Sequence, residues 1–221
     1  MTGSVPVAAA ALAGVPAGVQ SQGVWAGRRQ LFVRFAGEAE TATMYTSTAL
    51  VREMERQLGR SKFHSISIGG RDPLANVPFL LAALGAAKPA LPIMLDTDGQ
   101  RPGALGDLAH LLAMVQVTVE FTGSDAATAQ AMSTLSVAAA AKRAHALVIC
   151  PKEDTTDAQI LRLVEQAQGA SADVEVVIHP NSTSGDTPAV DRRWSSLLEQ
   201  AMVTHADCRL VTRISPPAGL R

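Results

Sequence analysis

The sequence predicts a single α/β domain, because short apolar runs alternate along the chain with longer segments whose apolar residues have helical spacing. The apolar runs are nearly continuous, which is typical of strands buried on both faces of a parallel sheet. Parallel strands need crossover connections, and the chain contains about six β-α repeats. These observations predict an open doubly wound sheet or a partial (β/α)6 TIM-like barrel. The 221 residues are enough for one domain with a sizeable core.

Seven segments are predicted as strands, since each is a short and mostly apolar run. They are Leu31–Ala36, Ser65–Ile68, Pro92–Leu95, Val115–Phe121, Ala146–Cys150, Val174–Ile178 and Arg209–Thr212. Residues 1–17 are predicted to be an N-terminal segment, and residues 18–221 the domain itself.

Six segments between and after these strands have the apolar spacing of helices. They are Thr48–Leu58, Pro73–Ala87, Gly103–Met114, Asp125–Arg143, Thr156–Ala170 and Trp194–His205. Ser47 or Thr48 can cap the first helix, and Asp72 is a candidate cap for the second. Residues 154–157 are a favourable helix start, because acidic side chains there complement the helix dipole. The polar loop Asn181–Val190 is predicted to be mobile or a lid.

The composition excludes several classes of function. With two cysteines, Cys150 and Cys208, the chain cannot build a metal site that needs three or four thiolates. A net charge of -1 and 4% aromatic residues give no sign of a nucleic-acid partner. No segment has the ~18 consecutive apolar residues of a membrane span. The stretch Val5–Val19 has no Lys or Arg before it and contains two prolines, so a cytoplasmic location is expected.

Candidate ligand-binding residues follow the strands directly, because ligands of such folds bind at the carboxyl ends of parallel strands. Gly69 and Gly70 end the second predicted strand, and a glycine pair either lets a ligand approach the backbone or forms a plain turn. Asp96-Thr97-Asp98-Gly99 follows the third strand. Its two carboxylates either bind a ligand or form an Asx turn before the next helix, and the residues leave both readings open.

These strand-end motifs resemble those of the 7-carboxy-7-deazaguanine synthases, which are small radical S-adenosylmethionine (SAM) enzymes. Residues 18–37 resemble the start of that family, and Ser67–Leu74 resembles its Thr-Gly-Gly-Glu-Pro-Leu motif. Leu95–Gly99 is similar to its Leu-Glu-Thr-Asn-Gly, and Ile178-His179-Pro180 to its Leu-Gln-Pro. The resemblance covers most of the chain from Gly18. It implies a partial (β/α)6 barrel and, by analogy, a homodimer.

The chain departs from the family at the motif that holds the iron–sulfur cluster. The family has Cys-x3-Cys-x2-Cys at this point, and the same spacing falls here on Glu38, Ala42 and Tyr45. The comparison therefore implies a protein without a [4Fe–4S] cluster, since thiolates hold such clusters. The family's Mg²⁺-binding Asp-Thr is replaced by Thr46-Ser47, so the resemblance gives no support for a bound metal.

The motifs for SAM and substrate are altered rather than lost. The resemblance assigns the substrate to Gln20, Gln22 and Arg34, and a guanidinium can bind a carboxylate through two parallel hydrogen bonds. Arg71 either binds the SAM carboxylate or lies in solvent. The full set assigned to SAM is Gly69, Gly70, Arg71, Asp72, Asp96, Thr97 and Asp98.

Four further residues are candidates for the chemistry, and each has a plainer interpretation. Tyr45 supplies a hydroxyl or fills the space of the lost cluster. Glu38 is a base or a loop carboxylate. His179 is a general base or a hydrogen-bonded structural histidine. Glu120 lies late in a strand, and if it points inward it needs a charged partner or a raised pKa.

We expect an enzyme that binds SAM as a co-substrate and uses its activated sulfonium in polar chemistry. Methyl transfer to a small carboxylated or heterocyclic substrate is the first hypothesis, with cyclisation or lysis of SAM as a close alternative. A second hypothesis is a catalytically inactive relative that scaffolds or regulates a partner. A third is a binding protein for a carboxylated heterocycle held by Arg34. We expect no nucleic-acid or membrane partner.

Overall fold

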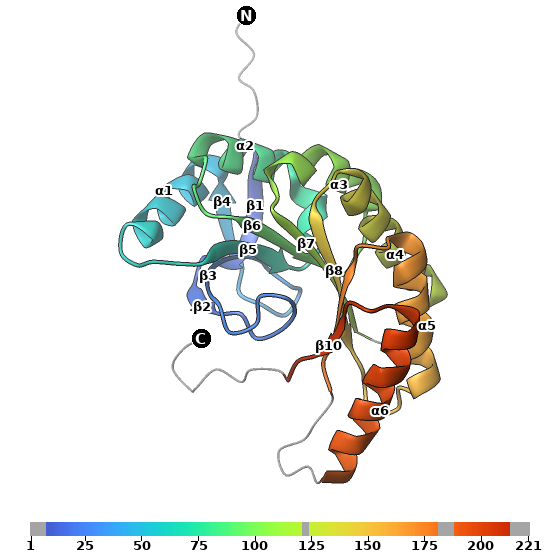
Figure 1. Cartoon of the computed structure of the whole chain (residues 1–221). Coiled ribbons are helices and arrows are strands. Elements are labelled where there is room, and N and C mark those ends of the chain that lie inside the picture. Colours follow the sequence, from blue (N-terminus) through green and yellow to red (C-terminus); the bar gives the residue numbers. More distant parts are fainter. Residues whose placement is uncertain (1–7, 121–123, 181–187, 213–221) are drawn as a thin grey trace, which may run out of the picture.

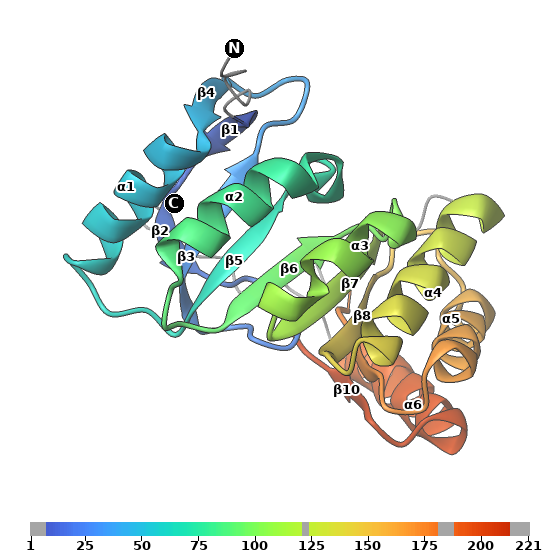
Figure 2. The same ribbon diagram turned by 90° about the horizontal axis from the view of Figure 1, so that it is seen from above.

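The structure is a computed structural model that describes residues 8–120, 124–180 and 188–212. Its centre is one mixed sheet of ten strands, with helices along its outer side (Figures 1 and 2). The strand order is β10-β9-β8-β7-β6-β5-β3-β1-β4, with β2 paired to β3. The α/β class is confirmed. In the described residues the sheet is open, with β10 and β4 at opposite ends of this order, so the partial barrel stays a prediction.

All seven predicted strands are present, and they run parallel to one another in the sheet. Their carboxyl ends therefore meet at one edge, which is where the candidate residues lie. Their bounds are β3 (Arg29–Phe35), β5 (Ser65–Gly70), β6 (Ile93–Thr97), β7 (Met114–Glu120), β8 (Ala144–Cys150), β9 (Glu175–Ile178) and β10 (Cys208–Leu210).

Three short strands near the N-terminus were not predicted from the sequence. β1 (Ala9–Gly14) lies between β3 and β4 (Thr43–Thr46) and is antiparallel to both. β2 (Ala17–Val19) is antiparallel to β3. β1 alternates exposed and buried residues, with Leu12 fully buried, but its small side chains give a weak pattern in the sequence. Part of the stretch Val5–Val19 is therefore sheet.

The helices follow the predicted order with several corrected bounds. The predicted helix Pro73–Ala87 is a 3-10 turn, η1 (Pro73–Asn76), followed by α2. The predicted helix Gly103–Met114 ends early, because Met114 already begins β7; α3 stops at Leu108 and a 3-10 turn, η2 (Ala109–Leu111), follows. The helices are α1 (Ser47–Leu58), α2 (Val77–Ala87), α3 (Pro102–Leu108), α4 (Asp125–Ala140), α5 (Asp157–Ala170) and α6 (Pro188–Thr204).

Two predicted helix caps are wrong and one helix start is confirmed. Thr46, not Ser47 or Thr48, caps α1, since its Oγ1 accepts a hydrogen bond of 3.1 Å from the Ala49 amide. Asp72 makes no capping hydrogen bond and instead pairs with an arginine. Thr156 begins α5 through a capping box. The predicted mobile loop falls largely on residues 181–187, which lie outside the described residues.

The two faces of the sheet differ in what they pack against. Outward-pointing strand residues such as Val33, Ile68 and Val117 join the main core beneath the helices. Inward-pointing residues such as Met94 and Val148 form two small clusters, which contact Val24 from the segment between β2 and β3. This segment lies on the inner side of the sheet, opposite the helices (Figure 1). Among the described helices, none has the length and apolar character to cross a membrane.

Candidate active site

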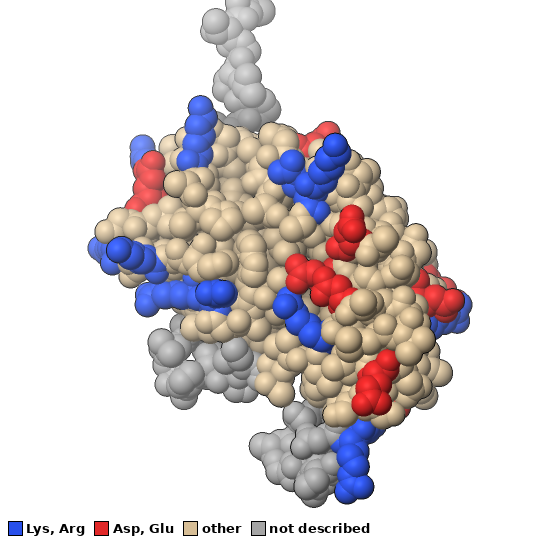
Figure 3. Space-filling view, viewed as in Figure 1, with Lys and Arg blue, Asp and Glu red and all other residues tan. Residues whose placement is uncertain are grey.

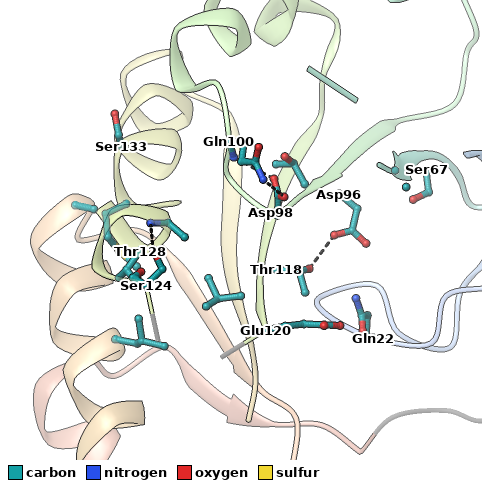
Figure 4. A pocket seen from close by; sticks show the side chains of 18 of the residues that line it. Gln22, Ser67, Asp96, Asp98, Gln100, Thr118, Glu120, Ser124, Thr128 and Ser133 are labelled. Atoms are coloured by element: carbon teal, nitrogen blue, oxygen red, sulfur yellow. Dashed lines mark hydrogen bonds between the residues drawn. The ribbon is translucent and has the colours of Figure 1, made fainter. Parts of the chain in front are cut away.

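A cavity of about 1700 Å³ opens on the inner face at the carboxyl edge of the sheet and extends over α4 (Figure 4). Side chains alternate along a strand, so Gln116, Thr118 and Glu120 share the inner face with Met114. On β7 this face is therefore polar toward the carboxyl end and apolar at Met114. Ser67 of β5, which is 2% exposed, also lines the cavity. Such a mixed lining is typical of small-molecule sites.

Asp96 is the central ionisable group of this cavity. The Thr118 hydroxyl donates a hydrogen bond of 2.8 Å to Asp96 Oδ1 (Figure 4). Burial raises the pKa of Asp96 above its ordinary value, while hydrogen bonding by Thr118, Gln116 and Gln20 acts in the opposite direction. The Nε2 atoms of Gln20 and Gln116 are buried and make no hydrogen bond of good geometry, so these two amides act on Asp96 more weakly than the threonine. A carboxyl group with a raised pKa can accept or hold a proton closer to neutral pH.

The other residues of the β6 end form a turn, as the simpler interpretation of their sequence predicts. Asp98 Oδ1 accepts a hydrogen bond of 3.1 Å from the Gln100 amide, and Thr97 Oγ1 accepts one of 3.2 Å from Gly99. Asp98 Oδ2 also accepts from the Gln100 side chain at 2.7 Å. Thr97 and Asp98 nevertheless line the cavity. The turn and a ligand-binding role are therefore compatible at this strand end.

Of the two glycines at the end of β5, only Gly70 is required by the local backbone structure. Gly70 has a φ of 93°, and a Cβ there would lie 2.3 Å from the Phe35 carbonyl oxygen. At Gly69 a Cβ would make ordinary contacts, the nearest being 3.4 Å from the Asp96 carbonyl oxygen. Both glycines line the cavity. Close packing of β5 on β3 thus accounts for Gly70 without a ligand.

The three arginines near this edge are paired with acidic side chains. Arg34 lines the cavity and contacts Glu40 at 2.8 Å. Arg71 contacts Glu38 at 2.8 Å, with both side chains largely exposed. Arg101 contacts Asp72 at 2.8 Å. Exposed pairs of this kind contribute about 0–1 kcal/mol, so a ligand carboxylate can compete with Glu40 for the Arg34 guanidinium.

The predicted substrate residues Gln20 and Gln22 come from the segment on the inner side of the sheet. Gln22 lines the cavity, and its side chain and that of Glu120 point toward one another (Figure 4). Gln20 is 4% exposed and lies beside Asp96. The structure therefore brings Gln20, Gln22, Asp96 and Glu120 together from three separate elements.

Three predicted chemistry residues are not among the described residues that line the cavity. Tyr45 is on β4, the last strand of the sheet, and packs against the main core. Glu38 is exposed and paired with Arg71. His179 is 2% exposed, and its Nε2 accepts a hydrogen bond of 2.8 Å from the Gly23 amide. Direct catalytic roles for these residues stay predictions.

Gln116, Thr118 and Ser67 were not predicted from the sequence. For Gln116 and Thr118 a signal is present, because polar residues occupy every second position from Gln116 to Glu120 in an otherwise apolar run. A period of two places these polar residues on one face of the strand. The apolar positions of the same run predict a buried strand, and they do not show that its other face belongs to a site.

The residues of this chain do not fit a cluster held by three thiolates. Glu38 and Ala42 follow β3, Tyr45 is on β4, and the two cysteines lie elsewhere, at the end of β8 and the start of β10. No group of three or more His, Cys, Asp or Glu side chains in the described ranges is placed to hold a metal ion. On the face shown in Figure 3, positive and negative side chains are interspersed, so that face has no patch of a single sign.

Comparison with known proteins supports the resemblance drawn from the motifs. The chain is 29% identical over 116 residues to the 7-carboxy-7-deazaguanine synthase of Methanothermobacter thermautotrophicus, covering 46% of each chain. It is 25% identical over 201 residues to the enzyme of the same name from Geobacter sulfurreducens, covering 76% of this chain and 80% of that one. The first match thus spans less than half of the relative. The chain is similar to enzymes of a radical SAM family.

The other comparisons add little. No family model matches the chain. Among solved structures, the chain is similar to a type I 3-dehydroquinate dehydratase from Clostridium difficile, with a TM-score of 0.45 and 11% identity. That match covers 73% of this chain and 70% of the other.

Proposed function

We propose that this chain is an enzyme that binds SAM and a small polar substrate in the inner-face cavity and uses the SAM sulfonium in polar chemistry. The observation that carries the proposal is the position of Asp96, a carboxyl with a raised pKa that faces the cavity beside Gly69 and the β6 turn. The similarity to 7-carboxy-7-deazaguanine synthases supports SAM as the co-substrate. The mismatch of the donor set at Glu38, Ala42 and Tyr45 argues against a step through a cluster.

Methyl transfer is the reaction that requires the fewest catalytic groups from these residues. The lone pair of a substrate nucleophile attacks the methyl carbon, and the carbon–sulfur bond breaks with its electron pair going to sulfur. S-adenosylhomocysteine leaves, and the proton of the nucleophile passes to a base. Asp96 is suited to accept that proton, because burial raises its pKa. The remaining contribution of the protein is to align the two reactants.

The cavity offers complementary groups for both molecules. Carboxylates at the β6 end are acceptors for ribose hydroxyls, and Glu120 adds negative charge that favours a cationic sulfonium. Arg34 can bind a substrate carboxylate in place of Glu40. A substrate with one carboxylate and several hydrogen-bond donors therefore matches this lining.

One observation favours an inactive relative as a second candidate. Arg71 and Asp72, both predicted to contact SAM, are paired with Glu38 and Arg101 respectively. If these pairs persist in solution, Arg71 and Asp72 do not make their predicted contacts with the amino-acid end of SAM. A scaffold or regulator would then be the better description.

Calorimetric titration of the full chain with SAM separates these candidates. We expect binding in the wild type, at least tenfold weaker binding in D96N, and no change in D107N, which alters an exposed carboxylate on α3. Mass spectrometry of the reaction mixture then distinguishes S-adenosylhomocysteine, the product of transfer, from methylthioadenosine, the product of lysis or cyclisation. Absence of binding at millimolar SAM overturns the proposal.

A further inference from the structure

The segment Gln20–Arg28, here termed the inner loop, is anchored to the inner face of the sheet by its backbone. Its base is closed by two hydrogen bonds of 2.9 Å, from the Gln20 amide to the Arg28 carbonyl and from the Gly27 amide to the Gln20 carbonyl. Between them the loop crosses the face opposite the helices (Figure 1). Buried amides of such a segment that have no backbone partner must be satisfied by side chains or water.

Two buried side chains, Gln116 within β7 and His179 directly after β9, accept hydrogen bonds from consecutive amides of the inner loop. His179 Nε2 accepts from the Gly23 amide at 2.8 Å, and Gln116 Oε1 accepts from the Val24 amide at 3.2 Å. His179 is 2% exposed and Gln116 is fully buried. Because Nε2 is the acceptor, the imidazole is neutral and carries its hydrogen on Nδ1.

The contact is close enough that only glycine fits at position 23. Gly23 has a φ of 77°, and a Cβ there would lie 1.8 Å from Gln116 Oε1. Such a backbone conformation and such an approach are both available to glycine alone. The loop and its two acceptors are therefore fitted to each other.

Apolar contacts place the rest of the loop. Val24 packs on the inner-face clusters that contain Met114 and Val148, and the Trp25 ring lies edge-on to His64 at 5.0 Å. The loop thus covers the small apolar clusters of the inner face. Its first residues reach the cavity, which Ser21 and Gln22 line.

We infer that His179 and Gln116 are positioning residues, which hold the inner loop so that Gln22 faces the ligand and Gln20 stays beside Asp96. The two hydrogen bonds from the loop to His179 and Gln116 are here termed the clamp. The role of the loop in ligand binding rests on the proposed function, whereas the existence of the clamp does not. His179 acts through the Gly23 amide and not on the substrate. The clamp also supports Asp96, because the Gln20 side chain acts on this carboxyl.

Two variants of His179 test the clamp in the full chain. H179A removes the acceptor, and H179Q supplies a carbonyl oxygen that can accept from the same amide. Hydrogen exchange followed by mass spectrometry should show the amides of residues 20–28 exchanging roughly tenfold faster or more in H179A, since a buried hydrogen bond is lost. Peptides from β8 and α5 should be unchanged, and H179Q should restore protection.

The pKa of Asp96 is a second measurement that requires no ligand. Carboxyl NMR should show a higher pKa for Asp96 in H179A than in the wild type or H179Q, because a released loop withdraws the Gln20 amide. Should H179A fail to fold, Q116A removes the other acceptor, at the Val24 amide, and tests the same loop contact from β7. Unchanged exchange in residues 20–28, or equal acceleration across the chain, overturns the clamp.

Calorimetry with SAM tests the ligand part separately. We expect H179A to bind SAM at least tenfold more weakly and H179Q to bind like the wild type. A loosened loop with unchanged SAM affinity overturns the positioning role. Absence of SAM binding in the wild type overturns the proposed function and leaves the exchange and NMR results to decide the clamp.

Discussion

Asp96 and Thr118, on the neighbouring parallel strands β6 and β7, are joined by a hydrogen bond of 2.8 Å in which the threonine hydroxyl donates to the carboxyl oxygen. This contact lies in the lining of the inner-face cavity and opposes the rise in pKa that burial imposes on Asp96. The balance between these two effects sets the protonation state of the central group of the site.

Replacing Thr118 by valine should raise the pKa of Asp96 further. Valine has a similar shape but no hydroxyl, so the ionised carboxyl loses its strongest described donor. At pH values where Asp96 is ionised, T118V should also lower the free energy of unfolding by about 1–3 kcal/mol. Carboxyl NMR titration and urea unfolding measure the two effects. T118S retains the hydroxyl and serves as the control; equal pKa values in T118V and T118S would contradict the assignment.

The stability of the wild type should depend on pH through Asp96. Its pKa is raised in the folded protein, so the folded state binds the proton more tightly than the unfolded state does. The stabilisation is therefore present below the unfolded pKa and is lost as pH rises through the folded pKa. D96N does not titrate, so its stability relative to the wild type should increase with pH in this window. Parallel stability curves for the two proteins between about pH 3 and pH 8 would refute this.

Alanine at Gly70 should destabilise the fold even though the position lies at the cavity. A Cβ there meets the Phe35 carbonyl oxygen at 2.3 Å, and the φ of 93° is unfavourable for alanine. We expect a loss of roughly 2 kcal/mol or more, measured by denaturant unfolding. Gly85 on α2 is the matched control, since a Cβ there has no neighbour within 4 Å. G85A should be stabilising by about 0.5–1 kcal/mol.

Cys208 should be nearly inert toward alkylation in the folded protein. Burial, with a smaller contribution from Asp207, raises the pKa of its thiol to about 11. At pH 8 the thiolate fraction is then about a hundredfold lower than for a free cysteine, and the thiolate is the reactive species. Site-resolved mass spectrometry after iodoacetamide treatment measures the rate, with the urea-unfolded chain as reference. Comparable rates in the two states would show that the thiol is accessible and ionised.

The strands show which structural elements a local sequence pattern can predict and which it cannot. Runs such as Ala146–Cys150 are apolar at nearly every position, and this identifies a strand of a parallel sheet without knowledge of its neighbours. β1 consists mostly of alanine, and β4 is a run of only four residues, so neither has a clear pattern. The pairing of β1 with β3 and β4 defines both strands. The predicted cap at Asp72 was wrong for a similar reason: its partner, Arg101, lies 29 positions away in the chain.

In the candidate site, too, local sequence patterns predict some features and contacts between distant residues decide the others. The sequence by itself determined the α/β class, the edge of the sheet that carries the polar strand ends, and the presence of only two cysteines. The tertiary structure alone decided that Thr118 faces the cavity with Asp96. It also decided that Gln116 accepts from the Val24 amide and that His179 accepts from Gly23, 156 positions away. The periodicity of apolar and polar residues is a property of neighbouring positions and can be read from the sequence alone. Contacts between distant segments depend on sheet order and loop placement, which no local pattern encodes.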